Sequence, residues 1–81
     1  MSFEIEWHPV ARLDLLAIPW RAAARIDAAV MRFAATGQGD IKRISPTDPR
    51  KLRLFVPGVV AVLFVDGSKR TVHVGRVFPS G

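Results

Sequence analysis

The stretch RAAARIDAAVMRFAAT, residues 21–36, has the most regular pattern in the chain and decides the fold. Its larger apolar residues recur every three or four positions, which is the period of an amphipathic helix. The expected inner face consists of Ala23, Ile26, Val30, Phe33 and Ala34. Alanines between these positions favour a helix. Gly37 follows directly and is well placed to end the helix in a left-handed cap.

The residues before this helix predict a strand and a second, shorter helix. Residues 3–7 alternate between apolar and acidic side chains, as a half-buried strand does. Pro9 ends the strand, because proline cannot donate to a ladder of hydrogen bonds. Residues 10–16 then read as a short helix that Pro19 interrupts, with inward-facing apolar residues Val10, Leu13 and Leu16.

The residues after the long helix predict four strands. These are a weak strand at 41–44, a strand of alternating basic and apolar residues at 51–55, and strands at 59–65 and 71–78. The run 59–65 is apolar throughout, which is typical of a strand covered on both faces. Asp66-Gly67-Ser68 predicts a hairpin before the last strand, in which Val72 and Val74 share a face.

The expected order is therefore β-α-α-β-β-β-β in a single domain, residues 1–81. Two helices followed by hairpin-linked strands indicate an α+β fold, in which both helices pack on one face of a small antiparallel twisted sheet. The first strand has to pair with a later strand. A domain-swapped dimer remains an alternative, since a chain of 81 residues builds only a small core.

Composition excludes several classes of protein. The chain has no cysteine, so disulfides and thiol chemistry are absent. No apolar run approaches the roughly 20 residues of a membrane span. The acidic, alternating N-terminus is unlike a signal peptide. We therefore expect a soluble, cytoplasmic protein.

Charge is distributed unevenly along the chain. Residues 1–40 carry four basic and five acidic side chains, whereas residues 41–81 carry eight basic and two acidic ones. The formal net charge is therefore −1 over residues 1–40 and +6 over residues 41–81. Such a basic half suits phosphate groups or an acidic protein partner. The alternative is a solvated basic face without a ligand.

No motif for a cofactor or metal is recognisable. Gly37-Gln38-Gly39 follows a helix, whereas a phosphate-binding glycine loop precedes one. His8 and His73 have no cysteine and no carboxylate cluster near them in sequence, so we expect neither a metal site nor a cofactor. A structural role is the leading interpretation of His73.

Several weak motifs, in this order and spacing, resemble the RelE/ParE superfamily, the small basic toxins of bacterial type II toxin–antitoxin pairs. The opening EWHPVARLDLLAIP, residues 6–19, is similar to the superfamily's strand, small turn and alanine followed by an Asp-Leu pair. The other matching features are GQGD at 37–40, RKLRL at 50–54, Gly58, the Asp66-Gly67 hairpin and the valine-rich last strand.

The resemblance implies a toxin that a cognate antitoxin neutralises by wrapping around it, in a hetero-oligomer. RelE-like members cut mRNA inside the ribosome, and ParE-like members block DNA gyrase. We therefore expect inhibition of translation by a metal-independent endoribonuclease. The alternatives are a non-enzymatic gyrase inhibitor and a degenerate toxin that acts only with its antitoxin, including as a co-repressor.

RelE-like cleavage uses the RNA's own 2′-hydroxyl as the nucleophile, and basic side chains stabilise the charge of the transition state. The matching positions here are Lys51 and Arg53, which alternate on one strand and so share a face. The family's Gly-aromatic-Arg sequence is absent, because Gly58 is followed by Val-Val-Ala. The family's late tyrosine is absent as well, which leaves Arg76 as the third candidate.

Further residues are expected to contact a partner or a nucleic acid. They are Arg21, Arg25 and Arg32 on the long helix, together with Lys42 and Arg43. A solvated helix face is the alternative for the three arginines. Trp7 is expected in the core, and Trp20 as a loop plug or an antitoxin contact.

Overall fold

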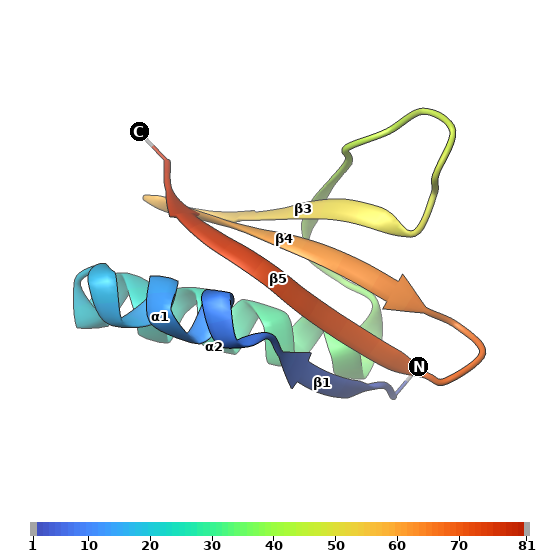
Figure 1. Ribbon diagram of the computed structural model, residues 1–81, viewed down its shortest axis with the longest axis horizontal. Helices are drawn as coiled ribbons and strands as arrows, with labels where there is room; N and C mark the ends of the chain where they lie inside the picture. The colour runs from blue at the N-terminus through green and yellow to red at the C-terminus, as the bar shows by residue number, and fades with distance from the viewer. Residues whose placement is uncertain (1, 81) are drawn as a thin grey trace.

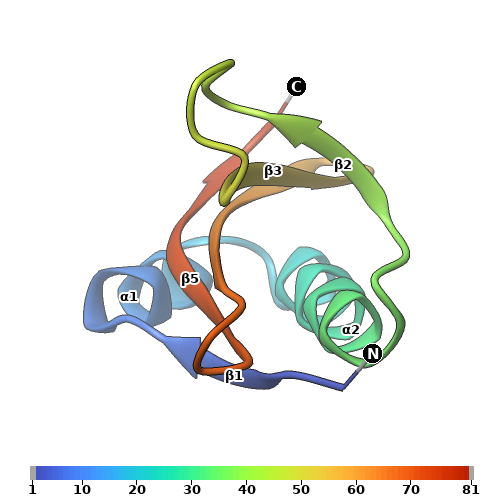
Figure 2. The same ribbon diagram turned by 90° about the vertical axis from the view of Figure 1, so that its right-hand side faces the viewer.

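The computed structural model describes residues 2–80, which form two helices and a five-stranded sheet (Figures 1 and 2). The elements are β1 (Glu4–Trp7), α1 (Pro9–Ala17), α2 (Trp20–Thr36), β2 (Asp40–Arg43), β3 (Lys51–Val56), β4 (Val59–Asp66) and β5 (Thr71–Pro79). The expected element order and α+β class are confirmed. Within residues 2–80, no helix has the length and apolar content needed to cross a bilayer.

The strands are arranged in the order β1-β5-β4-β3-β2. Strands β2 to β5 form an antiparallel meander, as expected. β1 takes the edge beside β5 and runs parallel to it, so the sheet is mixed rather than wholly antiparallel. In this register Glu6 lies opposite His73, and Trp7 lies opposite Val74.

The direction of β1 is explained by the position of α1, the next element along the chain. β1 pairs only with the first half of β5, and α1 then continues along the edge of the second half. The backbone N–H of His8 donates to the carbonyl of Val74 (3.0 Å), and the Asp14 carboxylate accepts the N–H of Val77 (2.9 Å). An antiparallel β1 would direct α1 away from this edge and leave the N–H of Val77 unpaired.

The core lies between α2 and the inner face of the sheet, whereas α1 lies along the edge of β5, so that Figure 2 shows the two helices on either side of that strand. Ile26, Val30, Phe33 and Ala34 are buried on α2, as the helical period predicted, but Ala22 is buried where Ala23 was expected. The buried strand residues are Leu54, Val59, Ala61, Leu63, Val72, Val74 and Val77. Gly37 caps α2 at φ 77°, and its N–H donates to the carbonyl of Phe33 (2.7 Å).

Two predictions about burial were wrong. Val10, Leu13 and Leu16 do not face inward: they are 49%, 65% and 84% exposed, and Ala11 is the buried residue of α1. α1 lies close to β5, where Ala11 is buried, and its Leu15 packs against the core, whereas Val10, Leu13 and Leu16 are left exposed. Strand β4 is also not covered on both faces, because its burial alternates and its outward side chains remain partly exposed.

A β-bulge changes the direction of the side chains in β5. Val62 pairs with Arg76 and Leu63 pairs with Val74, so Gly75 is an extra residue without a partner in the ladder. The extra residue shifts the alternation by one position. Arg76 therefore lies on the outer face, where unbroken alternation from Val72 and Val74 would have turned it inward.

Candidate functional site

The outer face of the sheet carries the three predicted catalytic residues and Lys42 in two rows that run across the strands. The first row is Lys42, Arg53, Val62 and Arg76, on β2, β3, β4 and β5. The second row is Lys51, Phe64, His73 and Glu6, on β3, β4, β5 and β1. Residues far apart in sequence thus lie next to one another because the strands are paired in register.

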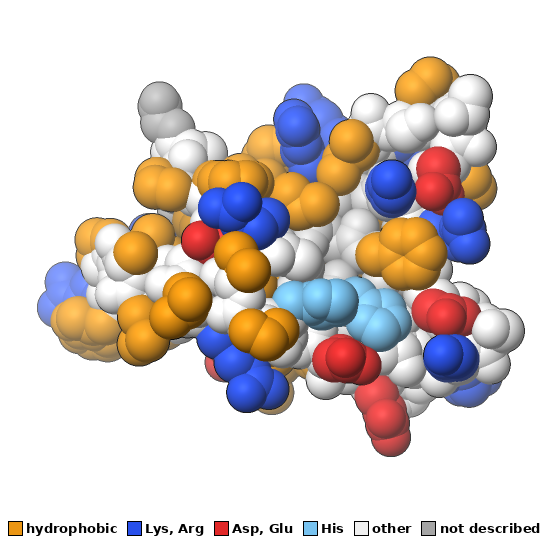
Figure 3. Space-filling model, in the orientation of Figure 1, with side chains coloured by type: hydrophobic (Ala, Val, Ile, Leu, Met, Phe, Trp, Pro, Cys, Tyr) orange, Lys and Arg blue, Asp and Glu red, His pale blue; other side chains and the backbone are white. Residues whose placement is uncertain are grey.

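An open pocket of about 520 Å³ lies on this face, and its wall is mainly apolar. It is lined by His8, Ile44, Lys51, Val62, Leu63, Phe64, His73 and Gly75. Figure 3 shows the imidazoles at the centre of this face, with hydrophobic side chains beside them and basic side chains above. The apolar floor comes from the outward residues of β4, which have no described element over them.

Lys51 and Arg53 lie on this face, as their alternation predicted. Both side chains are exposed, and neither has a hydrogen-bond or ion-pair partner among the described residues. Lys51 borders the pocket, and Arg53 stands between Lys42 and Val62 in the neighbouring row. These two cations are therefore available to a phosphate group.

Arg76, the third predicted catalytic residue, is on the same face but is already engaged. Its Nε donates to Asp14 Oδ2 (2.9 Å) and its Nη2 to Asp14 Oδ1 (3.4 Å). Its guanidinium also lies 4.8 Å from the ring centroid of Phe78. The hydrogen bonds from Arg76, then the one from the Val77 N–H, hold the pKa of Asp14 below its usual range. Arg76 therefore ties β5 to α1.

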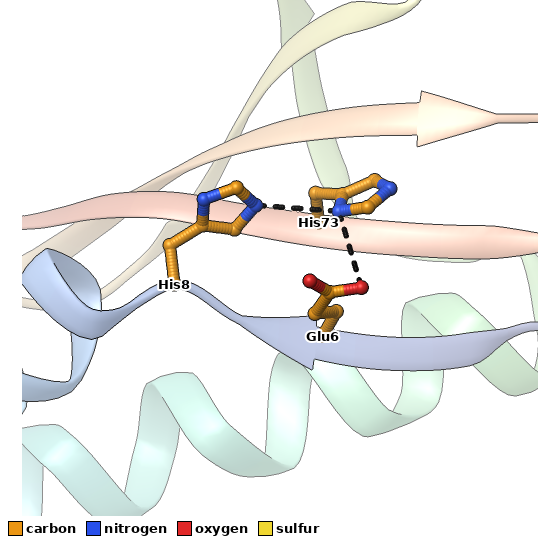
Figure 4. Close-up of side chains that lie close together, drawn as sticks. All are labelled: Glu6, His8 and His73. Carbon is orange, nitrogen blue, oxygen red and sulfur yellow. Dashed lines mark hydrogen bonds and ion pairs between the residues drawn. The ribbon is translucent and has the colours of Figure 1, made fainter.

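A histidine cluster lies beside the pocket, and the sequence did not reveal it (Figure 4). His8 Nε2 lies 3.3 Å from His73 Nδ1, and Glu6 Oε2 lies 3.7 Å from the same His73 atom. All three ligand atoms lie within 4.8 Å of one another, so these side chains could hold a metal ion. The sequence analysis expected no metal site, because no carboxylate cluster lies near the histidines in sequence; strand pairing places the single carboxylate of Glu6 beside both of them.

A sequence signal for this cluster existed in part. Glu6 and His8 are two positions apart in an extended segment, so they share a face. The missing fact was that β1 pairs with β5, which brings His73 opposite Glu6. That pairing brings together two histidines that are 65 residues apart, and it is fixed by tertiary structure rather than by any local pattern.

The predicted contact residues on α2 lie on its exposed side and make local contacts. Arg25 donates from Nε and Nη2 to the carbonyl of Pro57 (3.2 and 3.1 Å), which ties α2 to the β3–β4 turn. Arg32 donates to Gln38 (2.9 Å), and Arg21 lies over the ring of Trp20 (5.2 Å). The structure therefore gives Arg25 a structural contact and leaves Arg21 and Arg32 on the solvated face of the helix.

The other predicted contact residues lie on β2. Lys42 belongs to the first outer row and lies over the ring of Phe55 (5.5 Å), whereas Arg43 pairs with Leu52 at the end of the sheet. Of the two tryptophans, Trp7 packs against the core as expected. Trp20 is 74% exposed and so does not plug a loop.

Several solved structures share this fold. A RelBE toxin–antitoxin complex from Mycobacterium tuberculosis matches with a TM-score of 0.84 at 16% identity, over 99% of this chain and 93% of that one. An archaeal RelE–RelB complex from Pyrococcus horikoshii matches at 0.82 and 13% identity, over 100% and 98%. A mutant of the Escherichia coli toxin RelE in the free state matches at 0.74 and 15%, over 95% and 82%.

These likenesses cover nearly the whole chain and show that it has the RelE fold, as the resemblance implied. No protein-family model matches the sequence, and no curated protein matches it either. The likeness is therefore one of backbone architecture, carried at identities of 13–16%.

Proposed function

We propose that this chain, which has the RelE fold, is the toxin of a toxin–antitoxin pair and stops translation by cutting mRNA on the ribosome. The observation that carries cleavage is the pair of exposed cations, Lys51 and Arg53, on an open sheet face beside a pocket. The toxin role is supported by the matched structures, which are RelE toxins and their complexes with antitoxins. Such a toxin acts in the cytoplasm, where ribosomes are.

For this cleavage the protein mainly has to supply positive charge and hold it at the right position beside the phosphate. The RNA's 2′-oxygen loses its proton to solvent and attacks the adjacent phosphorus. The bond from phosphorus to the 5′-oxygen breaks, and the departing 5′-oxygen takes up a proton from solvent. A 2′,3′-cyclic phosphate and a 5′-hydroxyl result. Lys51 and Arg53 stabilise the extra negative charge that builds on the phosphate oxygens in the transition state. Neither side chain has to break a hydrogen bond or ion pair with another described residue in order to do so.

A second candidate function is binding without cleavage, as a gyrase inhibitor or as a partner that acts only through its antitoxin. The observation that favours it is the ion pair of Arg76 with Asp14, which occupies the third cation. The centre of the face is also apolar, because the outward residues of β4 there are Val60, Val62 and Phe64. An apolar centre with a polar rim is typical of a protein interface.

The antitoxin is expected to cover the exposed apolar residues of α1 and its surroundings. Val10, Leu13, Leu16 and Trp20 are all about half exposed or more. An amphipathic segment laid across them would bury this surface and favour a hetero-oligomer. The role of Trp20 as an antitoxin contact, one of the two expected from the sequence, belongs to this proposal.

Controlled expression tests the proposed function. Induction of the chain should arrest growth, and mapping of mRNA ends on ribosomes should show cuts within codons. The double variant Lys51→Ala/Arg53→Ala should abolish both effects. Lys69→Ala is the matched control, because it removes one positive charge from the β4–β5 turn and should leave both effects in place.

The outcomes separate the candidates. Growth arrest with intact transcripts would remove cleavage and keep the toxin role, and inhibition of gyrase supercoiling at micromolar protein would then identify the second candidate. Continued growth at a verified level of folded protein would remove the toxin role. Gel shifts of an antitoxin's operator, with and without this chain, would then test the co-repressor alternative.

A further inference from the structure

Three ligand-bearing side chains converge at the junction of β1, α1 and β5. Glu6 lies in β1, His8 lies directly after it, and His73 lies across from Glu6 in β5. Figure 4 shows Glu6 and His8 rising from the same chain segment toward His73, with the ring nitrogens of the two histidines facing each other. The cluster is brought together by strand pairing, so all three side chains have backbones that the sheet holds in place.

The backbone around these residues is firmly bonded. The N–H of His8 donates to the carbonyl of Val74 (3.0 Å), and the carbonyl of His8 accepts the N–H of Arg12 (3.0 Å) as α1 begins. His73 pairs with Phe64 on its other side, and the two rings lie 6.1 Å apart. Ligands that stand on strands and a helix start are positioned more precisely than ligands on a loop.

Hydrogen bonding among the three side chains is incomplete. A neutral imidazole carries one N–H, so the contact between His8 Nε2 and His73 Nδ1 uses one proton and one lone pair. Glu6 Oε2, at 3.7 Å from His73 Nδ1, is beyond hydrogen-bond distance. The three ligand atoms nevertheless lie within 4.8 Å of one another. A cation among them could accept a lone pair from each, once neither of the two facing nitrogens carries a proton.

We propose that Glu6, His8 and His73 form a binding site for one divalent transition-metal ion of the zinc type. Two nitrogens on a tetrahedral zinc ion lie about 3.3 Å apart, given zinc–nitrogen bonds of about 2.0–2.1 Å. The two facing histidine nitrogens already have this separation, at 3.3 Å. The carboxylate oxygen needs only a small movement of an exposed side chain to complete the set.

Two histidines and a glutamate leave a coordination position open. This donor set is used by zinc sites that keep one position for water or substrate. His8 and His73 also line the pocket on the outer face, so a ligand in that pocket would lie beside the ion. A bound ion would also connect β1 to β5 and so stabilise the folded chain. The site does not depend on the proposed toxin function.

Zinc titration of the full-length chain without an affinity tag tests the site. We expect one ion per chain by calorimetry, and a thermal midpoint raised by at least about 5 °C at saturating Zn²⁺. Co²⁺ should bind in place of zinc and give the visible absorption of a tetrahedral ion with nitrogen ligands. These readouts need neither an antitoxin nor an activity assay.

Variants locate the ion. His8→Ala and His73→Ala should each weaken zinc binding by more than the roughly 10–100-fold that loss of an outer hydrogen-bond partner costs. Glu6→Gln should weaken it as well, whereas Glu4→Gln should leave affinity unchanged. Glu4 is the matched control, because it lies on the same strand and the same face but opposite Thr71. Circular dichroism checks folding, and His73→Gln replaces His73→Ala if the latter unfolds.

Two results would overturn the proposal. One is zinc binding that is equally tight in the wild type and in folded variants at His8 and His73, since the ion would then lie elsewhere. The other is folded wild-type protein whose thermal midpoint does not change with Zn²⁺. Loss of binding in Glu4→Gln, to the same extent as in Glu6→Gln, would also contradict the assignment of ligands.

Discussion

The inner and outer faces of the sheet differ in what fixes their side chains. On the inner face, Val72, Val74 and Leu63 are buried in the core, and burial determines which residues stand there. On the outer face, strand register brings Lys51 and Arg53 side by side, and both side chains are exposed and without a hydrogen-bond or ion-pair partner among the described residues. Substitutions on the inner face should therefore affect mainly the stability of the fold, and substitutions on the outer face mainly the function.

The largest expected effect is on the free energy of unfolding and comes from a substitution on the inner face. Leu63→Ala removes a side chain that is 1% exposed, and we expect it to lower the free energy of unfolding by about 2–5 kcal/mol. Val62→Ala, the next residue but on the outer face, should cost less than about 1 kcal/mol. Urea unfolding at neutral pH measures both. Equal losses at the two positions would contradict the division between the faces.

The next effect is on activity and belongs to the outer face. If the chain cuts mRNA, Lys51→Ala should lower the cleavage rate on the order of 100-fold, because one transition-state contact is lost. The free energy of unfolding should stay within about 0.5 kcal/mol of the wild type, since Lys51 is exposed. Cleavage kinetics and urea unfolding on the same preparation separate the two quantities. A variant that loses stability and activity together would count against a purely functional outer face.

The ion pair between Asp14 of α1 and Arg76 of β5 should have a smaller effect on the free energy of unfolding. Asp14→Ala should lower the free energy of unfolding by about 1–2 kcal/mol, because the hydrogen bonds from Arg76 and Val77 are lost. The pKa of Asp14 is lowered in the folded state, so its contribution is fully present above the unfolded pKa of about 3.9. That contribution disappears as pH falls through the lower, folded pKa.

The pH dependence of the stability difference is the control for the prediction about Asp14. The difference in unfolding free energy between wild type and Asp14→Ala should be constant near neutral pH and shrink in acid, at pH values below about 3.9. Urea unfolding at a series of pH values measures it. A difference that grows toward low pH would have the wrong sign and would exclude the ion pair as its source.

The smallest effect concerns the β3–β4 turn, where α2 is tied to the sheet. Gly58 has φ of 85°, and a Cβ there would meet Arg25 Nη2 at 3.5 Å, an ordinary contact distance. Gly58→Ala should therefore cost about 1 kcal/mol from the left-handed backbone alone. Gly67→Ala, where a Cβ meets nothing within 4 Å, is the control and should be close to neutral. Thermal unfolding compares the two variants.

The sequence predicted those features that depend on local period and local turn chemistry. The helix over Trp20–Thr36, its glycine cap and the hairpin after Asp66 were expected, because each depends on neighbours within a few residues. Lys51 and Arg53 were placed on one face for the same reason. Their role in cleavage stays a prediction.

The sequence did not predict features that depend on which elements meet. α1 was expected to bury Leu13 and Leu16, but it contacts β5 through Ala11, and helical period alone cannot say which apolar side is covered. The apolar run of β4 suggested two covered faces, although one face is open. The bulge at Gly75 and the parallel pairing of β1 are tertiary features, and the histidine cluster depends on that pairing.

The parallel pairing of β1 with β5 also has a consequence for synthesis. β1 leaves the ribosome well before its partner, the segment from Thr71 to Val74. β1 therefore stays unpaired until that segment has been translated and released. Contacts between such distant residues form late and slowly. The histidine cluster and the edge that α1 protects thus form only after β5 has been made, so a nascent chain that lacks β5 carries neither.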